Sequence, residues 1–208
     1  MGRGVFITFE GGDGSGKSTQ IRLLHECLLA KGYTPIVARE PGGTRIGEQI
    51  RTVILDKENV EMCAMTEVLL YAAARAQLVS QVIKPNLDNG GIVICDRFAD
   101  SSTVYQGYGR DMLDVVGEVN AHAVMGCVPD LTFLLKIQPE IGEHRRSFEK
   151  RDRIEGESRS YHREVADGYL KLESLAPERI VGIDGMLGIE EISAIIRGVV
   201  LKFLKEVE

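Results

Sequence analysis

Residues 5–19 read VFITFEGGDGSGKST, and this stretch decides the fold. Val5–Phe9 is rich in β-branched and aromatic residues, residues 11–18 match G-x-x-x-x-G-K-[ST], and Lys17–Ala30 carries apolar residues at helical spacing. A buried strand, a glycine-rich loop and a helix in this order form a phosphate-binding loop, or P-loop. A glycine-rich turn that binds nothing is the alternative, and the flanking strand and helix disfavour it.

The P-loop predicts an ATP site, because backbone N–H groups and a helix N-terminus attract phosphate oxygens. Lys17 is expected to neutralise the β and γ oxygens, and the Ser18 hydroxyl to ligate Mg²⁺. Asp13 is unusual, since a carboxylate inside this loop is repelled by phosphate unless it faces the acceptor; a solvated turn residue is the alternative. The predicted ATP-binding residues are Gly11, Gly12, Asp13, Gly14, Ser15, Gly16, Lys17, Ser18 and Thr19.

Strand and helix patterns alternate along the rest of the chain. Short, almost continuously apolar strands are typical of a parallel sheet covered on both faces. We therefore predict an α/β fold, a doubly wound five-stranded parallel sheet flanked by helices, in one domain over residues 1–208. The further strands are predicted at Thr34–Ala38, Ile92–Cys95, Leu131–Leu135 and Ile180–Ile183, and the further helices at Ile46–Leu55, Glu67–Leu87, Val115–Met125 and Ile189–Leu204.

Composition excludes several classes of protein. With 208 residues, 44% of them hydrophobic, the chain can bury one sizeable core, and its net charge of −6 argues against a nucleic-acid-binding protein. The N-terminus lacks signal-peptide architecture and no apolar run is long enough for a membrane span, so a cytoplasmic protein is predicted. The four cysteines form no CxxC pair and are predicted to be small core residues in a reducing compartment.

The third predicted strand ends in Asp96 and Arg97. A carboxylate at this end of a strand beside the P-loop can hold Mg²⁺ through water. Hydrolytic motors commonly carry a second acid at the next position, so Arg97 favours transfer to an anionic acceptor over hydrolysis; a surface ion pair is the alternative. A GTPase is disfavoured because the chain contains no N-K-x-D segment. An ATP-dependent switch protein remains a rival.

Several segments, in order and spacing, resemble the thymidylate kinase family over nearly the whole chain. They are FEGGDGSGKST at 9–19, REPGGT at 39–44, LYAAARAQ at 70–77, DRFADSSTVYQG at 96–107 and DRIE at 152–155. The resemblance implies an ATP-dependent nucleoside monophosphate kinase with Mg²⁺ as cofactor, which transfers the γ-phosphoryl group to dTMP, giving dTDP and ADP in dTTP synthesis. It also implies a homodimer. Another nucleoside monophosphate as acceptor is the nearest alternative.

The resemblance assigns roles on the acceptor side. Tyr71 stacks on thymine and Arg75 donates to thymine O4, although pattern alone suggests a core tyrosine and a surface arginine. Ser101 and Ser102 contact the pyrimidine edge near N3, with helix capping as the alternative. The remaining roles are Tyr105 beneath the deoxyribose, Asp13 at the sugar, and Arg97 on the 5′-phosphate, with Arg51 and Arg45 as weaker candidates.

A lid is implied at about residues 142–163, a charged stretch that on its own reads as a solvated helix face. In the family, members with glycine at the position of Gly14 take their catalytic arginine from the lid. Arg153 is the first candidate, and one or more of Arg145, Arg146 and Arg151 are the others. The chain departs from the family pattern at Phe98, Val104 and Ala74, and Ala74 is expected to loosen the orientation of Arg75.

Overall fold

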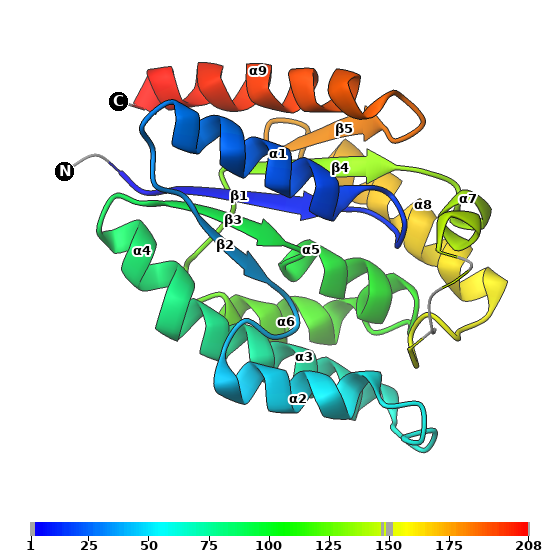
Figure 1. Cartoon of the computed structure of the whole chain (residues 1–208). Helices are drawn as coiled ribbons and strands as arrows, with labels where there is room; N and C mark the ends of the chain where they lie inside the picture. The colour runs from blue at the N-terminus through cyan, green and yellow to red at the C-terminus, as the bar shows by residue number, and fades with distance from the viewer. Residues whose placement is uncertain (1–2, 147, 149–151, 208) are drawn as a thin grey trace.

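The computed structural model describes residues 3–146, 148 and 152–207. All strands of its sheet run parallel, in the order β2-β3-β1-β4-β5, which confirms the predicted sheet (Figure 1). The strands are β1 (Val5–Glu10), β2 (Ile36–Arg39), β3 (Ile92–Asp96), β4 (Leu131–Lys136) and β5 (Ile180–Asp184). Each of them overlaps a strand predicted from the sequence.

The central strand β1 is buried along its whole length, as its apolar run requires. It pairs with β3 on one side, where Phe9 faces Asp96, and with β4 on the other, where Glu10 faces Leu134. The carboxyl ends of β1 and β3 therefore lie side by side. In an open parallel sheet this edge is where ligands bind.

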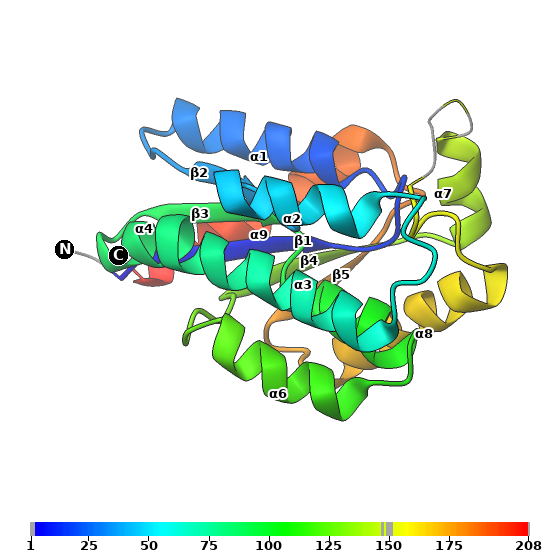
Figure 2. The same ribbon diagram turned by 90° about the horizontal axis from the view of Figure 1, so that it is seen from below.

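Helices cover both faces of the sheet. Figure 1 shows α1 and α9 above it and α2, α3, α4 and α6 below it, and Figure 2 shows α2, α3 and α6 side by side on the lower face. The helices are α1 (Lys17–Ala30), α2 (Arg45–Leu55), α3 (Ala64–Leu78), α4 (Lys84–Asp88), α5 (Ala99–Ser102), α6 (Leu113–Ala123), α7 (Pro139–Arg145), α8 (Arg159–Leu175) and α9 (Ile189–Val207), with π-helical turns η1 (Val79–Ile83) and η2 (Thr103–Tyr108).

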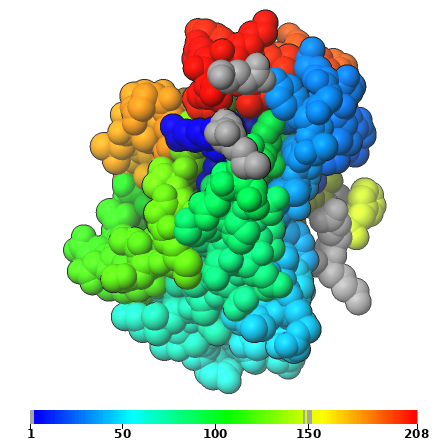
Figure 3. All heavy atoms as spheres, turned by 90° about the vertical axis from the view of Figure 1, so that its left-hand side faces the viewer, coloured from blue at the N-terminus to red at the C-terminus, as the bar shows by residue number. Residues whose placement is uncertain are grey.

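The core follows this layering. One apolar cluster joins β1, α1 and α9 through residues such as Phe9, Leu24 and Ile196, and a second joins the other face to α3 through Phe6 and Leu78. A third cluster packs α8 against η2. Figure 3 shows the end of the molecule that carries both termini, opposite the carboxyl ends of the strands.

The helix predicted at Glu67–Leu87 begins earlier, at Ala64, and is interrupted by η1. Pro85 explains the interruption, because proline has no N–H to donate to the carbonyl one turn back and its ring collides with that carbonyl. The chain accommodates this with one π-helical turn before α4.

The segment after β4 contains structure that the sequence analysis missed. The 17-residue helix α8 buries Tyr161, Val165 and Tyr169, which recur every fourth residue on one face. The charged residues between them obscured this helical period in the sequence. Of the predicted lid at 142–163, residues 147 and 149–151 lie outside the described residues, and with them the lid candidate Arg151.

The prediction that all four cysteines are core residues is wrong for two of them. Cys95 and Cys127 are buried, Cys27 is half-buried, and Cys63 is exposed at the start of α3. Cys63 precedes the buried face of its helix, so its apolar neighbours Ala64 and Met65 did not imply burial. Within the described part of the chain, no helix is both long and apolar enough to cross a membrane.

Candidate active site

The P-loop connects β1 to α1 as predicted, and its shape depends on glycine. Gly11, Gly14 and Gly16 have φ angles of 128°, 75° and 98°, in the left-handed region that other residues rarely adopt. The loop folds around the Lys17 ammonium, whose Nζ donates to the carbonyl oxygens of Gly11 at 3.0 Å and Gly12 at 2.9 Å. This leaves the start of α1, with Ser18 exposed and Thr19 half-exposed, at the carboxyl edge of the sheet.

Lys17 is buried, and this controls its charge. Burial and the positive charge of Arg97 lower the pKa of Lys17 to about 8, against the opposing effect of Asp13 and Asp96. Phosphate oxygens beside the ammonium would raise that pKa again. Binding of a polyphosphate should therefore be linked to proton uptake.

We expect ATP binding to take up about half a proton near pH 8, because free Lys17 is then half-protonated and bound Lys17 fully protonated. Titration calorimetry in two buffers of different ionisation enthalpy measures this uptake. Lys17→Arg is the control, since arginine keeps its charge and should abolish the buffer dependence. A binding enthalpy of the wild type that is equal in both buffers contradicts the assignment.

Ser18 and Asp96 meet where the P-loop helix faces the end of β3. Ser18 Oγ donates to Asp96 Oδ2 at 3.2 Å, so a hydroxyl and a carboxylate oxygen point into the same space. Among the described residues there is no cluster of three or more His, Cys, Asp or Glu side chains that could hold a metal by themselves. The Ser18–Asp96 pair fits Mg²⁺, which commonly takes one or two protein oxygens and completes its shell with phosphate and water.

Asp13 and Arg97 form an ion pair, with Asp13 Oδ1 at 2.6 Å from Arg97 Nη2. Burial raises the pKa of the Asp13 carboxyl, but the charges of Arg97, Lys17 and Arg146 outweigh it, and the pKa lies well below its usual value. Asp13 is thus a paired carboxylate, and the solvated-turn interpretation of Asp13 is wrong. The pair also excludes the interpretation of Asp96 and Arg97 as a surface ion pair, because Arg97 turns to the P-loop instead.

The Arg97 backbone is itself unusual, with φ of 67° at a non-glycine residue. Such a conformation costs about 1–2 kcal/mol and persists where the surroundings impose it. Here Arg97 N donates to the carbonyl of Phe9 at 2.9 Å, and Nη1 donates to Ser101 Oγ and the Tyr169 hydroxyl, both at 3.2 Å. The guanidinium also lies over the Tyr105 ring, 5.1 Å from its centre.

Glu10, the last residue of β1, organises this neighbourhood. Its buried carboxylate accepts from the backbone N–H of Phe98 at 2.8 Å, from Ser101 Oγ at 2.6 Å and from the Tyr169 hydroxyl at 2.8 Å. Burial and Asp100 raise the pKa of Glu10, while Arg97 and these donors oppose the rise. Ser101 lies inside α5, and Ser102 precedes η2 but makes no capping hydrogen bond with its side chain, so the capping interpretation is wrong for both.

A cavity of about 120 Å³ adjoins the side chains of Asp13 and Arg97. It brings together most of the residues predicted on the acceptor side, from α2, α3, β3, η2 and the lid. Of the predicted residues it is lined by Asp13, Arg51, Tyr71, Arg75, Arg97, Ser101 and Tyr105, and of the others by Glu40, Pro41, Leu55, Phe98, Gln106, Asp152, Ile154 and Glu155.

Arg75 lies at the inner end of this cavity with 1% of its surface exposed, so it is not the surface charge that its pattern suggests. Nε donates to Glu40 Oε2 at 2.8 Å, Nη2 to Ser102 Oγ at 2.9 Å and Nη1 to Asn120 Oδ1 at 2.6 Å. These partners fix the guanidinium, and the expected loosening by Ala74 is wrong. Among the described residues Asn120 is the one acceptor of Nη1, which leaves its second hydrogen for a ligand.

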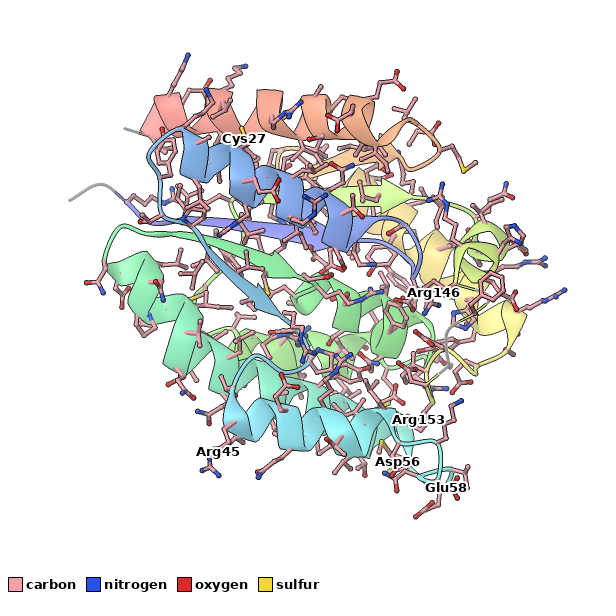
Figure 4. All side chains as sticks on the ribbon, viewed as in Figure 1. Cys27, Arg45, Asp56, Glu58, Arg146 and Arg153 are labelled. Carbon is pink, nitrogen blue, oxygen red and sulfur yellow. The ribbon has the colours of Figure 1, made fainter. Side chains whose placement is uncertain are left out.

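The lid arginines divide between two places, as Figure 4 shows for Arg146 and Arg153. Arg146 lies beside the P-loop, with Nη2 4.0 Å from Asp13 Oδ2, and Arg145 Nη1 donates to the Gly14 carbonyl at 3.2 Å. Arg153 lies near the end of α2, where Nε donates to the Ile54 carbonyl at 2.8 Å. Arg45 lies at the start of α2 and points outward, away from the cavity.

A larger cavity of about 1090 Å³ adjoins the other side of the P-loop, between the ends of β4 and β5 and helices α7 and α8. Asp13, Tyr105 and Glu155 line both cavities. Gly14 packs against Gly142 of α7, where a side chain on either glycine would collide with the other segment. Helix α7, which overlaps the start of the predicted lid, therefore lies directly on the P-loop.

Sequence reasoning missed the residues that hold the site together, namely Glu10, Glu40, Glu67, Asn120 and Tyr169. Some signal existed for two of them. Glu10 is a charged residue at the end of an otherwise apolar strand, and Glu67 lies one helical turn before Tyr71 on the same face. The partners of Glu40 and Asn120 are distant in sequence and left no local pattern.

Comparison with known proteins identifies the family. The family model described as thymidylate kinase matches residues 9–196. Thymidylate kinase of Thermoanaerobacter sp. (strain X514) is 48% identical over 203 residues, covering 97% of this chain and 100% of the relative; that of Exiguobacterium sp. (strain ATCC BAA-1283 / AT1b) is 50% identical over 189 residues, with 90% and 89% covered. The crystal structure of thymidylate kinase from Ehrlichia chaffeensis matches with a TM-score of 0.79 at 30% identity, over 95% of this chain and 99% of that one. The chain belongs to the thymidylate kinase family.

Proposed function

We propose that this enzyme transfers the γ-phosphoryl group of ATP to thymidylate, giving dTDP and ADP. The observation that carries the proposal is the position of Asp13. It belongs to the P-loop, which is built for a polyphosphate, and its side chain also lines a small cavity whose wall contains three arginines and three aromatic rings. Two anionic ligands can thus approach each other from opposite sides of one residue, as phosphoryl transfer requires.

In the proposed reaction an oxygen of the thymidylate phosphate attacks the γ-phosphorus. The bond from that phosphorus to the β–γ bridging oxygen breaks, and ADP leaves with the electron pair. The attacking oxygen is already ionised near neutral pH, so the reaction needs in-line positioning and positive charge more than a strong base. Lys17 is suited to the donor phosphates and Arg97 to the acceptor phosphate, and the lid arginine Arg146 lies beside Asp13, with Nη2 4.0 Å from Asp13 Oδ2.

Arg97 can bind the acceptor phosphate because Asp13 and Tyr169 orient its guanidinium. Its guanidinium is held at 2.6 Å by Asp13 and lies over the Tyr105 ring, so it is oriented before any ligand arrives. Arg51, whose Nη1 donates to the Pro41 carbonyl at 2.9 Å, lines the same cavity and supplies a second charge. Asp13 itself is assigned to the sugar side of the acceptor.

Selectivity for thymine is assigned to Tyr71 and Arg75, which lie one turn apart on α3 and face the same cavity. The remaining Nη1 hydrogen of Arg75 suits an acceptor such as thymine O4. Cytosine carries an amino donor at that position, and a buried donor left unpaired costs about 1–3 kcal/mol. Ser101 is assigned to the ring edge near N3, while Ser102, bound to Arg75, acts by holding that arginine.

Mg²⁺ is the proposed cofactor. Ser18 and Asp96 would hold it, Asp96 through water, and when bound it would supply positive charge to the phosphate oxygens. Exclusion of water then depends on the lid, since Asp152, Ile154 and Glu155 line the acceptor cavity. We further propose that the enzyme acts in dTTP synthesis and that it is cytoplasmic.

We also propose a homodimer, which forms through helices α2 and α3 of the layer below the sheet in Figure 1, the layer that faces the viewer in Figure 2. Val53 of α2 and Met65 and Leu69 of α3 are 45%, 42% and 51% exposed, although α2 and α3 pack together. Exposed apolar side chains on adjacent helices are typical of subunit interfaces. Sedimentation of the wild type against Leu69→Asp tests this, because a dimer through this face should dissociate in the variant.

The activity is tested by ADP release with ATP, Mg²⁺ and a panel of acceptors: thymidylate, deoxyuridylate, deoxycytidylate, adenylate and guanylate. We expect thymidylate to be fastest and deoxyuridylate weaker by about 10–200-fold, the range for one methyl group in a pocket. The reaction without acceptor is expected to be almost silent. Equal ADP release without acceptor would instead support an ATP-dependent switch protein, and a faster purine acceptor would reassign the substrate.

A further inference from the structure

Besides Glu10 and Glu40 there is a third buried carboxylate, Glu67 of α3, which contacts both the cavity residue Gln106 and the lid residue Arg153 and has no role in the proposed reaction. It is 1% exposed, and both of its oxygens accept hydrogen bonds. Oε1 accepts from Gln106 Nε2 at 3.0 Å and Arg110 Nε at 3.3 Å. Oε2 accepts from Arg110 Nη2 at 3.2 Å and forms an ion pair with Arg153 Nη2 at 2.7 Å.

These partners come from three different segments. Gln106 belongs to η2, directly after the cavity residue Tyr105; Arg110 follows η2; and Arg153 belongs to the lid. Arg110 reaches the lid a second time, since its Nη2 lies 2.5 Å from Glu157 Oε1. The Glu67 carboxylate thus connects helix α3 and turn η2, which both line the acceptor cavity, to the lid.

The lid turn at Asp152–Glu155 is built to present Arg153 to Glu67. The Asp152 N–H donates to Glu155 Oε2 at 3.0 Å and the Glu155 N–H donates to Asp152 Oδ1 at 2.9 Å, which closes the turn. Ile154 is buried at 5% exposure, and the Arg153 backbone N–H donates to the Leu55 carbonyl at 3.2 Å. The Arg153 side chain is 11% exposed, and its described contacts are with α2 and Glu67.

The charge of Glu67 suits a permanent anchor. Burial raises the pKa of Glu67, but hydrogen bonds from Gln106 and Arg110 outweigh it and the pKa lies below its usual value. Glu67 therefore stays ionised while the lid is docked. Tyr71 follows Glu67 by one turn on the same helix and lines the same cavity as the lid residues Asp152 and Ile154.

Resting on the proposed function, we propose that Glu67 is a positioning residue for the acceptor, and that Arg153 is its lid partner rather than a ligand of the transferred phosphate. Glu67 acts by holding residues 152–155 in place as the roof of the acceptor cavity. Loss of this anchor should weaken thymidylate binding and leave ATP binding unchanged, since the P-loop contacts of α7 do not involve Glu67.

The test compares Glu67→Gln, which removes the charge at constant shape, with Arg153→Lys, which keeps the charge but loses the guanidinium contacts. Asp130→Asn is the matched control, because Asp130 is a carboxylate with an 8% exposed side chain that pairs with Arg3 and accepts from the Phe6 N–H, at the end of the sheet opposite the site. In both anchor variants we expect KM for thymidylate to rise roughly tenfold, the effect of losing one modest interaction, with KM for ATP within about twofold. The control should change neither KM.

Hydrogen exchange of residues 152–158 provides a readout that needs no activity. The amides of Arg153, Gly156 and Glu157 donate to Leu55, Asp152 and Ile154, and both anchor variants should exchange them at least about tenfold faster. A fall in kcat for Arg153→Lys without any change in Glu67→Gln would overturn the proposal, because Arg153 would then act on the phosphates. Unchanged exchange would also overturn it. If the wild type does not phosphorylate thymidylate but the exchange pattern holds, the proposed function fails and the anchor stands.

Discussion

Replacing Arg97 by alanine is expected to lower kcat/KM for thymidylate by about 10³-fold, the lower end of the effect of arginines that stabilise a transferring phosphoryl group. Arg97 is held by Asp13 at 2.6 Å and by Ser101 and Tyr169 at 3.2 Å, so its charge is fixed where the acceptor phosphate is proposed to bind. Preoriented charge of this kind needs no rearrangement during the reaction. Steady-state kinetics with thymidylate and ATP measure the loss.

Two further variants of Arg97 distinguish the effect of its charge on activity from the effect of its backbone conformation on stability. Arg97→Lys keeps a positive charge but cannot reach Asp13, Ser101 and Tyr169 together, so it should recover only part of the rate. Arg97→Gly should be as inactive as Arg97→Ala yet more stable to urea by about 1 kcal/mol, because glycine relieves the left-handed backbone at φ of 67°. A kcat/KM for Arg97→Ala within about tenfold of the wild type would contradict the role of Arg97.

The fold could be predicted largely because its signals are local. A parallel sheet covered on both faces needs continuous apolar strands, and IVIC at 92–95 and LTFLL at 131–135 supply them directly. Helix α8 escaped prediction although Tyr161, Val165 and Tyr169 have helical spacing, because charged residues separate them. The break at η1 depends on one proline within a pattern that otherwise continues through it.

The residues of the site, unlike the fold, were predicted from the family resemblance and not from local sequence patterns. Tyr71 and Arg75 were selected by resemblance, and the structure brings both to one cavity, but no pattern revealed that Arg75 would be buried. Its burial depends on Glu40, 35 positions earlier, and on Asn120, 45 positions later. For Arg153 the situation is reversed. The DRIE motif identifies the residue, but only its ion pair with Glu67 in the structure indicates its role. Partners that tertiary structure brings together are beyond single-sequence reasoning.

Glu40→Gln is expected to lower the free energy of unfolding by about 3–5 kcal/mol, the usual cost of leaving one member of a buried ion pair without its counter-charge. The side chains of Arg75 and Glu40 are 1% and 3% exposed, with Nη2 and Oε2 2.7 Å apart. The neutral amide of the variant could still accept a hydrogen bond, but Arg75 would stay charged with only 1% of its surface exposed. Urea denaturation followed by circular dichroism measures the change.

A contrast within the same segment sharpens this expectation. Glu48 pairs with Arg39 at 2.8 Å, but these side chains are 44% and 46% exposed, so Glu48→Gln should cost no more than about 1 kcal/mol. The double variant Glu40→Gln/Arg75→Met should recover part of the loss, because an apolar side chain of similar length leaves no unpaired charge. If Glu40→Gln lowered the free energy of unfolding no more than Glu48→Gln, the charge of Arg75 would have to be stabilised by its hydrogen bonds to Asn120, Ser102 and the Phe98 carbonyl alone. Those dipoles, rather than Glu40, would then set the geometry of Arg75, which is proposed to bind the pyrimidine.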